Sequence, residues 1–385
     1  MFPVFYLAFT VARGFAGLII PLYFVSVGVP VLGVGLAVAT FGASLLIFEI
    51  LWGVLLDRTG SGWLVFLAVA LTVGTYVLIP LVKTSEGAIA TEFVLGISAP
   101  IVTLVARSNV ISESGSGKWA GGFGLLGAFY SVAQLIGSLI GGVGAVSLGL
   151  VECFYVTSAM ATAAYLLYLL AASRHPAPAT PRTERPRRER SPRPHLDWRG
   201  LPLLGLIAVP NYITFSFFAN IIQLVVVKTP AISGTAFDAG IVVSSFWLST
   251  ALFQPIMSWR GAQRARLWIG IAMLASFGVF AFMTQLLAVW EVAIGAFLAG
   301  ACYSAISPLS LSLLMLGIPS SYTGRAMGFY GAAEDIGVIL GPLLGSAVWV
   351  GFGLTPAYLT LGTTFLLALV PYAIGMRRPP TEPNR

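Results

Sequence analysis

Four ionisable residues interrupt long apolar stretches of the sequence: Arg13, Glu49, Glu334 and Asp335. A charge at the centre of a bilayer costs at least ~2.5–3.5 kcal/mol on the insertion scale, so residues of this kind usually pair or serve a function. Burial and a neighbouring like charge both favour the neutral form of a carboxyl group. A carboxyl group in such a place can therefore bind and release protons near neutral pH.

Two interpretations of these four residues stay open. In the first, Glu49, Glu334 or Asp335 carries protons. In the second, Arg13 forms a static bridge to a carboxylate and fixes helix packing; Arg13 and Glu49 lie at similar depths, roughly 15 and 12 Å at 1.5 Å per residue, which allows a pair. Three acids against one base leave a surplus carboxylate, which favours proton binding. Because adjacent helical residues point about 100° apart, we expect only one of Glu334 and Asp335 to face a given cavity.

The composition places these residues in a membrane protein. The chain has 385 residues, of which 57% are hydrophobic and 9% charged, whereas soluble domains have about 25% charged residues. A spanning helix needs ~20 apolar residues. The sequence predicts an all-α membrane protein with twelve transmembrane helices, near residues 3–27, 32–56, 62–82, 88–110, 119–146, 151–172, 201–227, 236–258, 266–286, 289–316, 323–349 and 354–376.

The basic residues predict the orientation of these helices. Of the 21 Lys and Arg, Lys83 and Lys228 fall on one side and Arg13 within a helix, and the other 18 fall on the opposite side. Loops rich in Lys and Arg face the cytoplasm. We therefore expect a multi-pass protein of the cell membrane with both termini in the cytoplasm. Glu92 and Glu291 are expected at the surface, near the external starts of helices 4 and 10.

The chain divides at one long polar segment. Residues 173–200 are rich in arginine and proline, which predicts a disordered basic cytoplasmic linker. It would join an N-terminal six-helix bundle, 1–172, to a C-terminal six-helix bundle, 201–378, followed by a cytoplasmic tail, 379–385. A nucleic-acid-binding arm is the disfavoured alternative, because basic clusters beside membrane helices are ordinary orientation and anionic-lipid signals.

The two halves repeat each other. An offset of 204 residues superposes Gly124 on Gly328, Gly127 on Gly331, Gly137 on Gly341 and Gly141 on Gly345. Four glycines in one register indicate duplication of a six-helix unit, an internal symmetry typical of secondary transporters. We therefore expect two pseudo-symmetric bundles.

A short motif follows the second apolar run. It reads GVLLDRTG and contains Gly53, Asp57, Arg58 and Gly60. This motif resembles the loop between helices 2 and 3 of the major facilitator superfamily of secondary transporters, although Ser61 and Gly62 replace two basic residues of the fuller pattern. The resemblance implies that Asp57 faces the start of helix 11 near Arg325 and latches the inner gate. Alternatively, Asp57 and Arg58 only end helix 2 at the membrane surface.

Helix 11 has a second pattern of the same family. Its spacing resembles the antiporter motif, which family exporters usually carry in helix 5; here helix 5 has Ala133 and Ser138 at two of the corresponding places. Such residues suit a moving interface, and static packing explains them equally well. The interface residues are Gly328, Gly337, Gly341, Pro342 and Gly345.

The resemblance also implies a central cavity between helices 1, 4, 7 and 10. An aromatic, lightly polar cavity suits an amphipathic organic molecule, whereas Arg13 alone would suit an organic anion. Each amide or hydroxyl there could instead serve helix packing. The candidates for substrate contact are Arg13, Tyr23, Thr103, Asn211, Tyr212, Asn220, Gln223, Tyr303, Ser304 and Ser307.

The resemblance implies a secondary active transporter that works by alternating access. We expect proton-coupled export of small amphipathic compounds, with proton-coupled or facilitative uptake of a small organic anion as the alternative. A non-transporting receptor or an intramembrane enzyme is the alternative of another class, and the predicted spans contain no His for catalysis. The expected partners are a small-molecule substrate, protons and membrane lipids. No cofactor, metal or nucleic acid is expected, and the protein is expected to be a monomer.

Overall fold

The computed structural model describes residues 2–59, 61–114, 119–174, 200–260, 264–316 and 323–376. The predicted linker lies almost entirely outside these residues, and the tail lies wholly outside them. The first half contains α1 (Phe2–Ser26), α2 (Val31–Thr59), α3 (Gly62–Leu78) with the short 3-10 helix η1 (Ile79–Leu81), α4 (Ser85–Ser114), α5 (Trp119–Ser147) and α6 (Leu150–Arg174).

The second half contains α7 (Gly200–Asn220), α8 (Ile222–Lys228), α9 (Ala236–Arg260), α10 (Ala265–Met283), α11 (Val289–Leu316), α12 (Thr323–Phe352) and α13 (Leu354–Met376). Across the described ranges, twelve helices are long and apolar enough to cross a membrane, which confirms the predicted all-α membrane fold. One prediction fails locally: the seventh run is not one helix, because it breaks at Ile221 and continues as α8.

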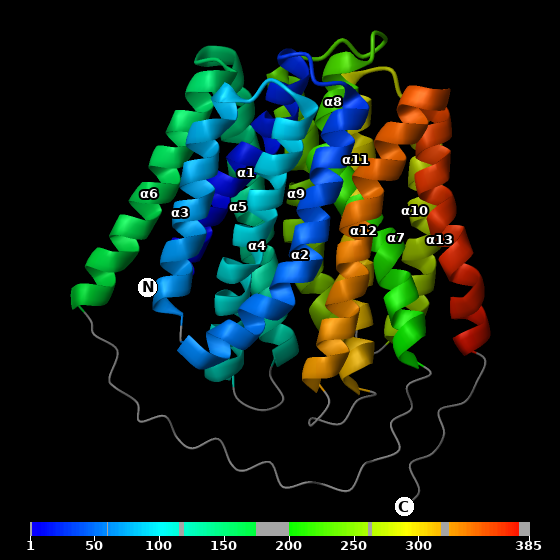
Figure 1. Ribbon diagram of the computed structural model, residues 1–385. Coiled ribbons are helices and arrows are strands. Elements are labelled where there is room, and N and C mark those ends of the chain that lie inside the picture. The colour runs from blue at the N-terminus through cyan, green and yellow to red at the C-terminus, as the bar shows by residue number, and fades with distance from the viewer. Residues whose placement is uncertain are drawn as a thin grey trace, which may run out of the picture.

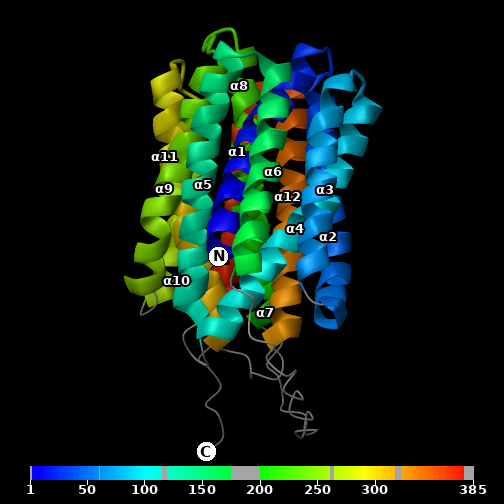
Figure 2. The same cartoon turned by 90° about the vertical axis from the view of Figure 1, so that its left-hand side faces the viewer.

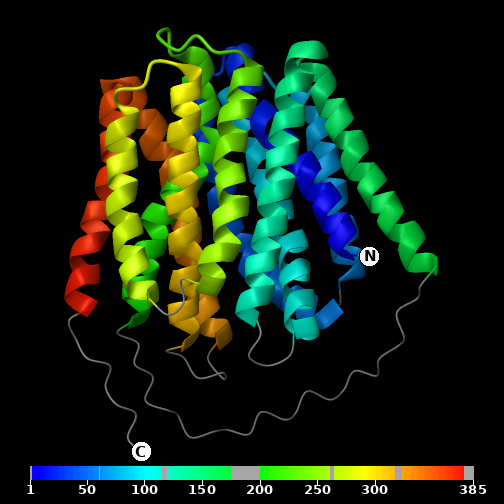
Figure 3. The same ribbon diagram turned by 180° about the vertical axis from the view of Figure 1, so that it is seen from behind.

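The helices run side by side, with α1–α6 on one side of the molecule and α7–α13 on the other (Figure 1). Helix α6 ends and α7 begins at the same end of the bundle, which we name the linker end. The opposite end carries α8 and is named the α8 end. Seen from behind, α5 of the first half and α9 of the second half lie side by side (Figure 3).

The glycine repeat corresponds to a repeated contact. A Cβ atom at Gly137 of α5 would overlap the carbonyl of Val11 on α1 and lie 2.7 Å from the amide nitrogen of Phe15. In the second half, a Cβ atom at Gly341 of α12 would lie 2.5 Å from the carbonyl oxygen of Ile213 on α7. In both halves, therefore, the fifth spanning helix packs backbone to backbone against the first, which only glycine permits at this distance.

A second contact repeats at positions that the sequence comparison did not use. Gly96 of α4 packs against the carbonyl of Phe41 on α2. Gly300 of α11, 204 residues later, packs against the carbonyl of Phe246 on α9. The duplication therefore extends to the second and fourth spanning helices of each half.

Two helix pairs form the most extensive contacts between the halves. Helices α5 and α9 meet at the paired hydroxyls of Ser138 and Ser244, 2.8 Å apart. Helices α2 and α12 meet closely at Gly42, where a Cβ atom would lie 3.0 Å from the backbone nitrogen of Ile339. Nearer the linker end, Gly53 and Gly328 have no atom of the described residues within contact distance, and the two helices diverge (Figure 1). The α2–α12 contact is therefore confined to the middle and the α8 end.

Candidate functional site

A cavity of about 350 Å³ lies between the two halves. Helices of both halves line it, and α1 lies deep in the molecule beside α5 and α6 (Figure 2). The lining runs from Pro21 and Phe41, in the halves of α1 and α2 toward the α8 end, to Tyr6 and Met327 nearer the linker end. The cavity is therefore central and reaches toward the linker end.

Six of the ten residues predicted for substrate contact line this cavity. They come from the first, fourth, seventh and tenth spans, as the family resemblance implied. Their roles toward a substrate stay predictions. They are Arg13, Thr103, Tyr212, Asn220, Tyr303 and Ser307.

The other four predicted contacts do not line the cavity. The hydroxyl of Tyr23 donates to the carbonyl of Pro80 at 2.7 Å, and Ser304 donates to Gly300 at 2.7 Å. The amide of Gln223 donates to the carbonyl of Gly17 across the two halves at 3.2 Å. Asn211 is fully buried, and its side-chain nitrogen and oxygen have no hydrogen-bond partner among the described residues. These four polar groups lie within the packing around the cavity.

Glu49 does not pair with Arg13. Its carboxylate accepts a hydrogen bond from Arg107 on α4 at 3.2 Å, and this is the one ion pair among the described residues. Arg107 was counted with the loop residues, but it lies within the spanning part of α4, Ser85–Asn109, and lines the cavity. The linker end therefore has one basic residue fewer than predicted. The prediction of three acids, Glu49, Glu334 and Asp335, against a single base was also wrong, because Arg107 is a second base in the cavity.

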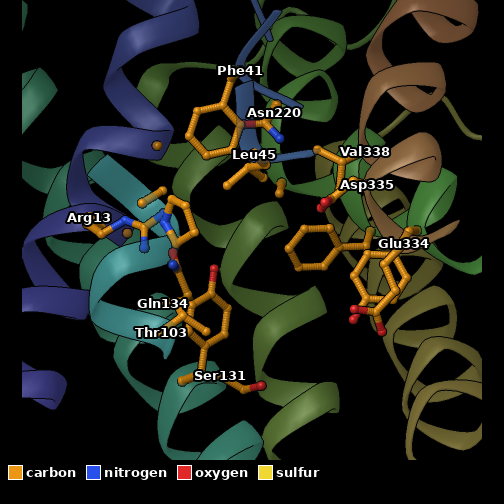
Figure 4. Close-up of a pocket in the computed structure, with 18 of the residues that line it drawn as sticks. Arg13, Phe41, Leu45, Thr103, Ser131, Gln134, Asn220, Glu334, Asp335 and Val338 are labelled. Carbon is orange, nitrogen blue, oxygen red and sulfur yellow. The ribbon is translucent and has the colours of Figure 1, made fainter. Parts of the chain in front are cut away.

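Glu334 and Asp335 both line the cavity, so the expectation that only one could face it was wrong. Figure 4 shows Asp335 beside Val338 and toward Leu45 of α2, whereas Glu334 interacts electrostatically with Tyr212 of α7. Two adjacent residues can reach one cavity because the cavity extends along both sides of α12.

Glu92 is a cavity residue that the sequence analysis placed at the surface. It lies about two turns into α4, retains 7% exposure and lines the cavity near Arg13, Thr72 and Tyr76. It forms no ion pair with a described residue. Its position in the helix was misjudged because α4 begins at Ser85. Glu291, in contrast, accepts hydrogen bonds from the backbone of Leu287 and Ala288 at a helix start, as expected.

The family follows from comparison with known proteins. The model of the Major Facilitator Superfamily matches residues 4–229 and 204–385. The chain belongs to the major facilitator superfamily. It is therefore a membrane transporter of small molecules and not an enzyme, and the receptor alternative is set aside as well.

Individual relatives are distant but cover most of the chain. The multidrug resistance protein MdtG of Proteus mirabilis is 23% identical over 85% of this chain and 82% of its own. The inner membrane transport protein YajR of Escherichia coli is 22% identical over 82% of this chain and 69% of its own.

Solved structures share the fold. A bacterial homologue of the human lysosomal transporter Spinster, crystallised inward-facing and occupied, has a TM-score of 0.73 at 12% identity, covering 98% of this chain and 95% of that one. The human organic anion transporter MFSD10 (TETRAN) has a TM-score of 0.65 at 16% identity, covering 96% and 98%.

The superfamily motif at the end of α2, Val31–Thr59, is only partly within the described residues. Gly53 lies in α2 with open space beside it. The side chains of Asp57, Arg58 and Arg325, and the whole of Gly60, lie outside the described residues. The latch between α2 and α12 therefore stays a prediction.

The glycines of α12 differ in what they contact. Gly337, Gly341 and Gly345 pack against α7 within their own half, whereas Gly328 has open space beside it. The carbonyl of Pro342 lies where α2 of the other half approaches at Gly35. Helix α12 therefore contacts α7 on one face and the opposite half on another.

Five aromatic side chains, which we name the aromatic wall, line the cavity together. Successive ring centroids lie 5.4–5.7 Å apart along the wall. The wall joins helices of both halves, because one residue comes from α5 and the others from α7, α9 and α11. Its members are Tyr130, Tyr212, Phe215, Trp247 and Tyr303.

Proposed function

We propose that this transporter is a proton-coupled exporter of small amphipathic organic compounds. The observation that carries the proposal is the position of Glu334 and Asp335 on α12. Both carboxyl groups line the cavity, and neither forms an ion pair with a described residue. A proton bound at either group would change the charge of the helix that contacts the opposite half, so proton binding can bias the motion of the halves.

Alternating access requires one end of the cavity to be closed while the other is open. At the α8 end the halves are joined by the Gln223–Gly17 hydrogen bond and by the contact of Gly35 with Ser346. At the linker end α2 and α12 diverge (Figure 1). We infer that the structure represents the state open toward the linker end. In the opposite state, Asp57 near Arg325 would latch that end.

The linker end is proposed to face the cytoplasm. Of the basic residues, Lys83 and Lys228 lie at the α8 end and Arg13 and Arg107 line the cavity. The sequence assigns the others to the segments that would meet at the linker end. This asymmetry follows the positive-inside rule. We accordingly propose a monomer of the plasma membrane with six-helix bundles at 1–172 and 201–378, joined by a disordered basic linker at 173–200, and a cytoplasmic tail at 379–385.

The substrate proposal rests on the size and lining of the cavity. A volume of about 350 Å³ falls within the range of small-molecule sites, and the aromatic wall with a few polar groups suits an amphipathic compound. The curated relatives named multidrug resistance proteins support export. Uptake of an organic anion is the weaker candidate, because four carboxyl groups and only two arginines line the cavity.

Reconstitution into liposomes tests the coupling. A pH-sensitive dye inside the vesicles would report proton movement when ethidium, chloramphenicol or salicylate is added as a cationic, neutral or anionic probe. We expect probe-dependent proton movement with the wild type, and its loss in Glu334→Gln or Asp335→Asn. Proton movement that is unchanged in both variants would contradict the proposal.

A further inference from the structure

The aromatic wall lines the same cavity as the carboxyl group of Glu334. Tyr212 on α7, Tyr303 on α11 and Glu334 on α12 all line this cavity, and Glu334 interacts electrostatically with both tyrosines. The rings of Tyr212 and Tyr303 are 5.7 Å apart at 72°, and Phe215 stacks on Tyr303 at 5.5 Å. One corner of the cavity therefore combines a carboxyl group with several electron-rich rings.

The rings continue from this corner into the other half. Trp247 on α9 contacts Phe215 at 5.6 Å and Tyr130 at 5.5 Å, in both pairs edge to face. Packing of this kind holds the rings in place, because each ring rests on its neighbour. The wall is thus a preformed surface, and a ligand would not need to order it.

The other charges of the cavity offset the acids on α12 only in part. Arg107 is bound by Glu49 at 3.2 Å and also acts electrostatically on Glu334. Arg13 is on α1 and acts electrostatically on Glu92, which lines the same region of the first half. Figure 4 places Arg13 across the cavity from Glu334 and Asp335. The side of the cavity formed by the second half is therefore the more negative side.

We infer that Glu334 and the aromatic wall form a subsite for the positively charged group of an organic cation. A cation within about 6 Å of an aromatic ring is attracted by the negative face of the ring, and rings combined with desolvation suit quaternary ammonium groups. The carboxylate of Glu334 adds direct charge attraction. The inference rests on the proposed transport of amphipathic compounds and names the class: a cation with an aromatic body.

Two compounds of equal shape separate this class from its alternatives. Biphenyl-4-trimethylammonium and biphenyl-4-sulfonate have the same body and a tetrahedral end group of opposite charge. Titration calorimetry on purified protein in a nonionic detergent measures the affinity for each compound. Titration into protein-free micelles corrects for binding to the detergent. We expect the ammonium compound to bind about tenfold tighter or more, since charge and ring attraction act together.

Variants assign the binding to the subsite. Glu334→Gln should weaken binding of the ammonium compound about tenfold without weakening binding of the sulfonate. Tyr303→Leu should weaken binding of the ammonium compound severalfold. Tyr303→Phe keeps the ring and should bind this compound like the wild type. Glu291→Gln, at a helix start away from the cavity, is the charge-matched control. Thermal unfolding of each variant shows whether it is folded.

The inference is overturned if the sulfonate binds as tightly as the ammonium compound, if neither compound binds, or if folded Glu334→Gln binds the ammonium compound like the wild type. Calorimetry measures binding in the absence of a proton gradient. The binding result is therefore independent of whether transport is coupled to protons. Selective binding of the cation together with pH-independent flux would support the subsite and refute the proposed coupling.

Discussion

Arg107 of α4 donates a hydrogen bond to the carboxylate of Glu49 on α2 at 3.2 Å, within the first half of the transporter. The side chains remain 36% and 28% exposed to the cavity. Arg107 also acts on Glu334 across the boundary between the halves. The pair therefore neutralises one carboxylate of the cavity and leaves the acids of α12 without an ion-pair partner among the described residues.

Removal of one member of this pair should cost more than removal of both. Arg107→Gln leaves Glu49 unpaired near Glu334 and Asp335, which repel it. Because the pair is partly exposed, we expect a coupling of about 0.5–1 kcal/mol in a double-mutant cycle with Glu49→Gln. Thermal unfolding of the four proteins in detergent measures it. Additive effects of the two substitutions would show that the contact adds nothing to stability.

Neutral substitution of the α12 acids should change transport in a specific way. Glutamine at position 334 and asparagine at position 335 cannot release a proton. We expect that a pH gradient no longer accelerates efflux from proteoliposomes in the responsible variant, while exchange of labelled for unlabelled substrate continues. Glu291→Gln is the control and should respond like the wild type. A full response to the gradient in both variants would exclude these two residues as proton carriers.

The sequence predicted the fold because the fold depends on features that are local in the chain. Runs of apolar residues mark the spans, and the glycines at 137 and 341 mark the close contact of α5 with α1 and of α12 with α7. The break at Ile221 carries no proline or glycine. It could not be predicted from local signals.

The site was predicted only in part, because pairing depends on helix rotation and depth. Arg107 lies in the part of α4 toward the linker end and was counted among the basic residues of that side, although its side chain reaches Glu49. Glu92 was assigned to a helix start because the beginning of α4 was placed too late. A signal for Arg107 was present: it is an arginine within the predicted span 88–110.

The glycine contacts predict that two glycines of α12, Gly341 and Gly328, differ in how well they tolerate substitution by alanine. A Cβ atom at Gly341 would lie 2.5 Å from the carbonyl oxygen of Ile213, whereas one at Gly328 meets nothing within 4 Å. We expect Gly341→Ala to destabilise the protein by about 1–3 kcal/mol, the typical cost of overpacking. Gly328→Ala, on the same helix, should be neutral. Thermal unfolding compares the two.

The repeated architecture extends this prediction to the first half. Gly137 occupies the place on α5 that Gly341 occupies on α12, and a Cβ atom there would overlap the carbonyl of Val11. Gly137→Ala should therefore destabilise to a similar degree. Equal stability of Gly137→Ala and Gly328→Ala would mean that α1 and α5 can separate without cost.

The hydrogen bond between Gln223 and Gly17 predicts how firmly the α8 end is closed. The Gln223 amide donates to the Gly17 carbonyl at 3.2 Å, and its own carbonyl oxygen is buried with no partner in the described part of the chain. Gln223→Met keeps the side-chain length and removes both groups. Loss of a bond worth about 1 kcal/mol between the halves should raise the open population of the α8 end about fivefold. The measurement uses Asn220→Cys, because Asn220 lines the cavity. An impermeant thiol reagent applied at the α8 end labels this cysteine only when that end is open, so the labelling rate reports the open population. Asn220→Cys with Gln223 intact is the reference, and equal labelling rates with and without Gln223→Met would show that this bond does not hold the halves together.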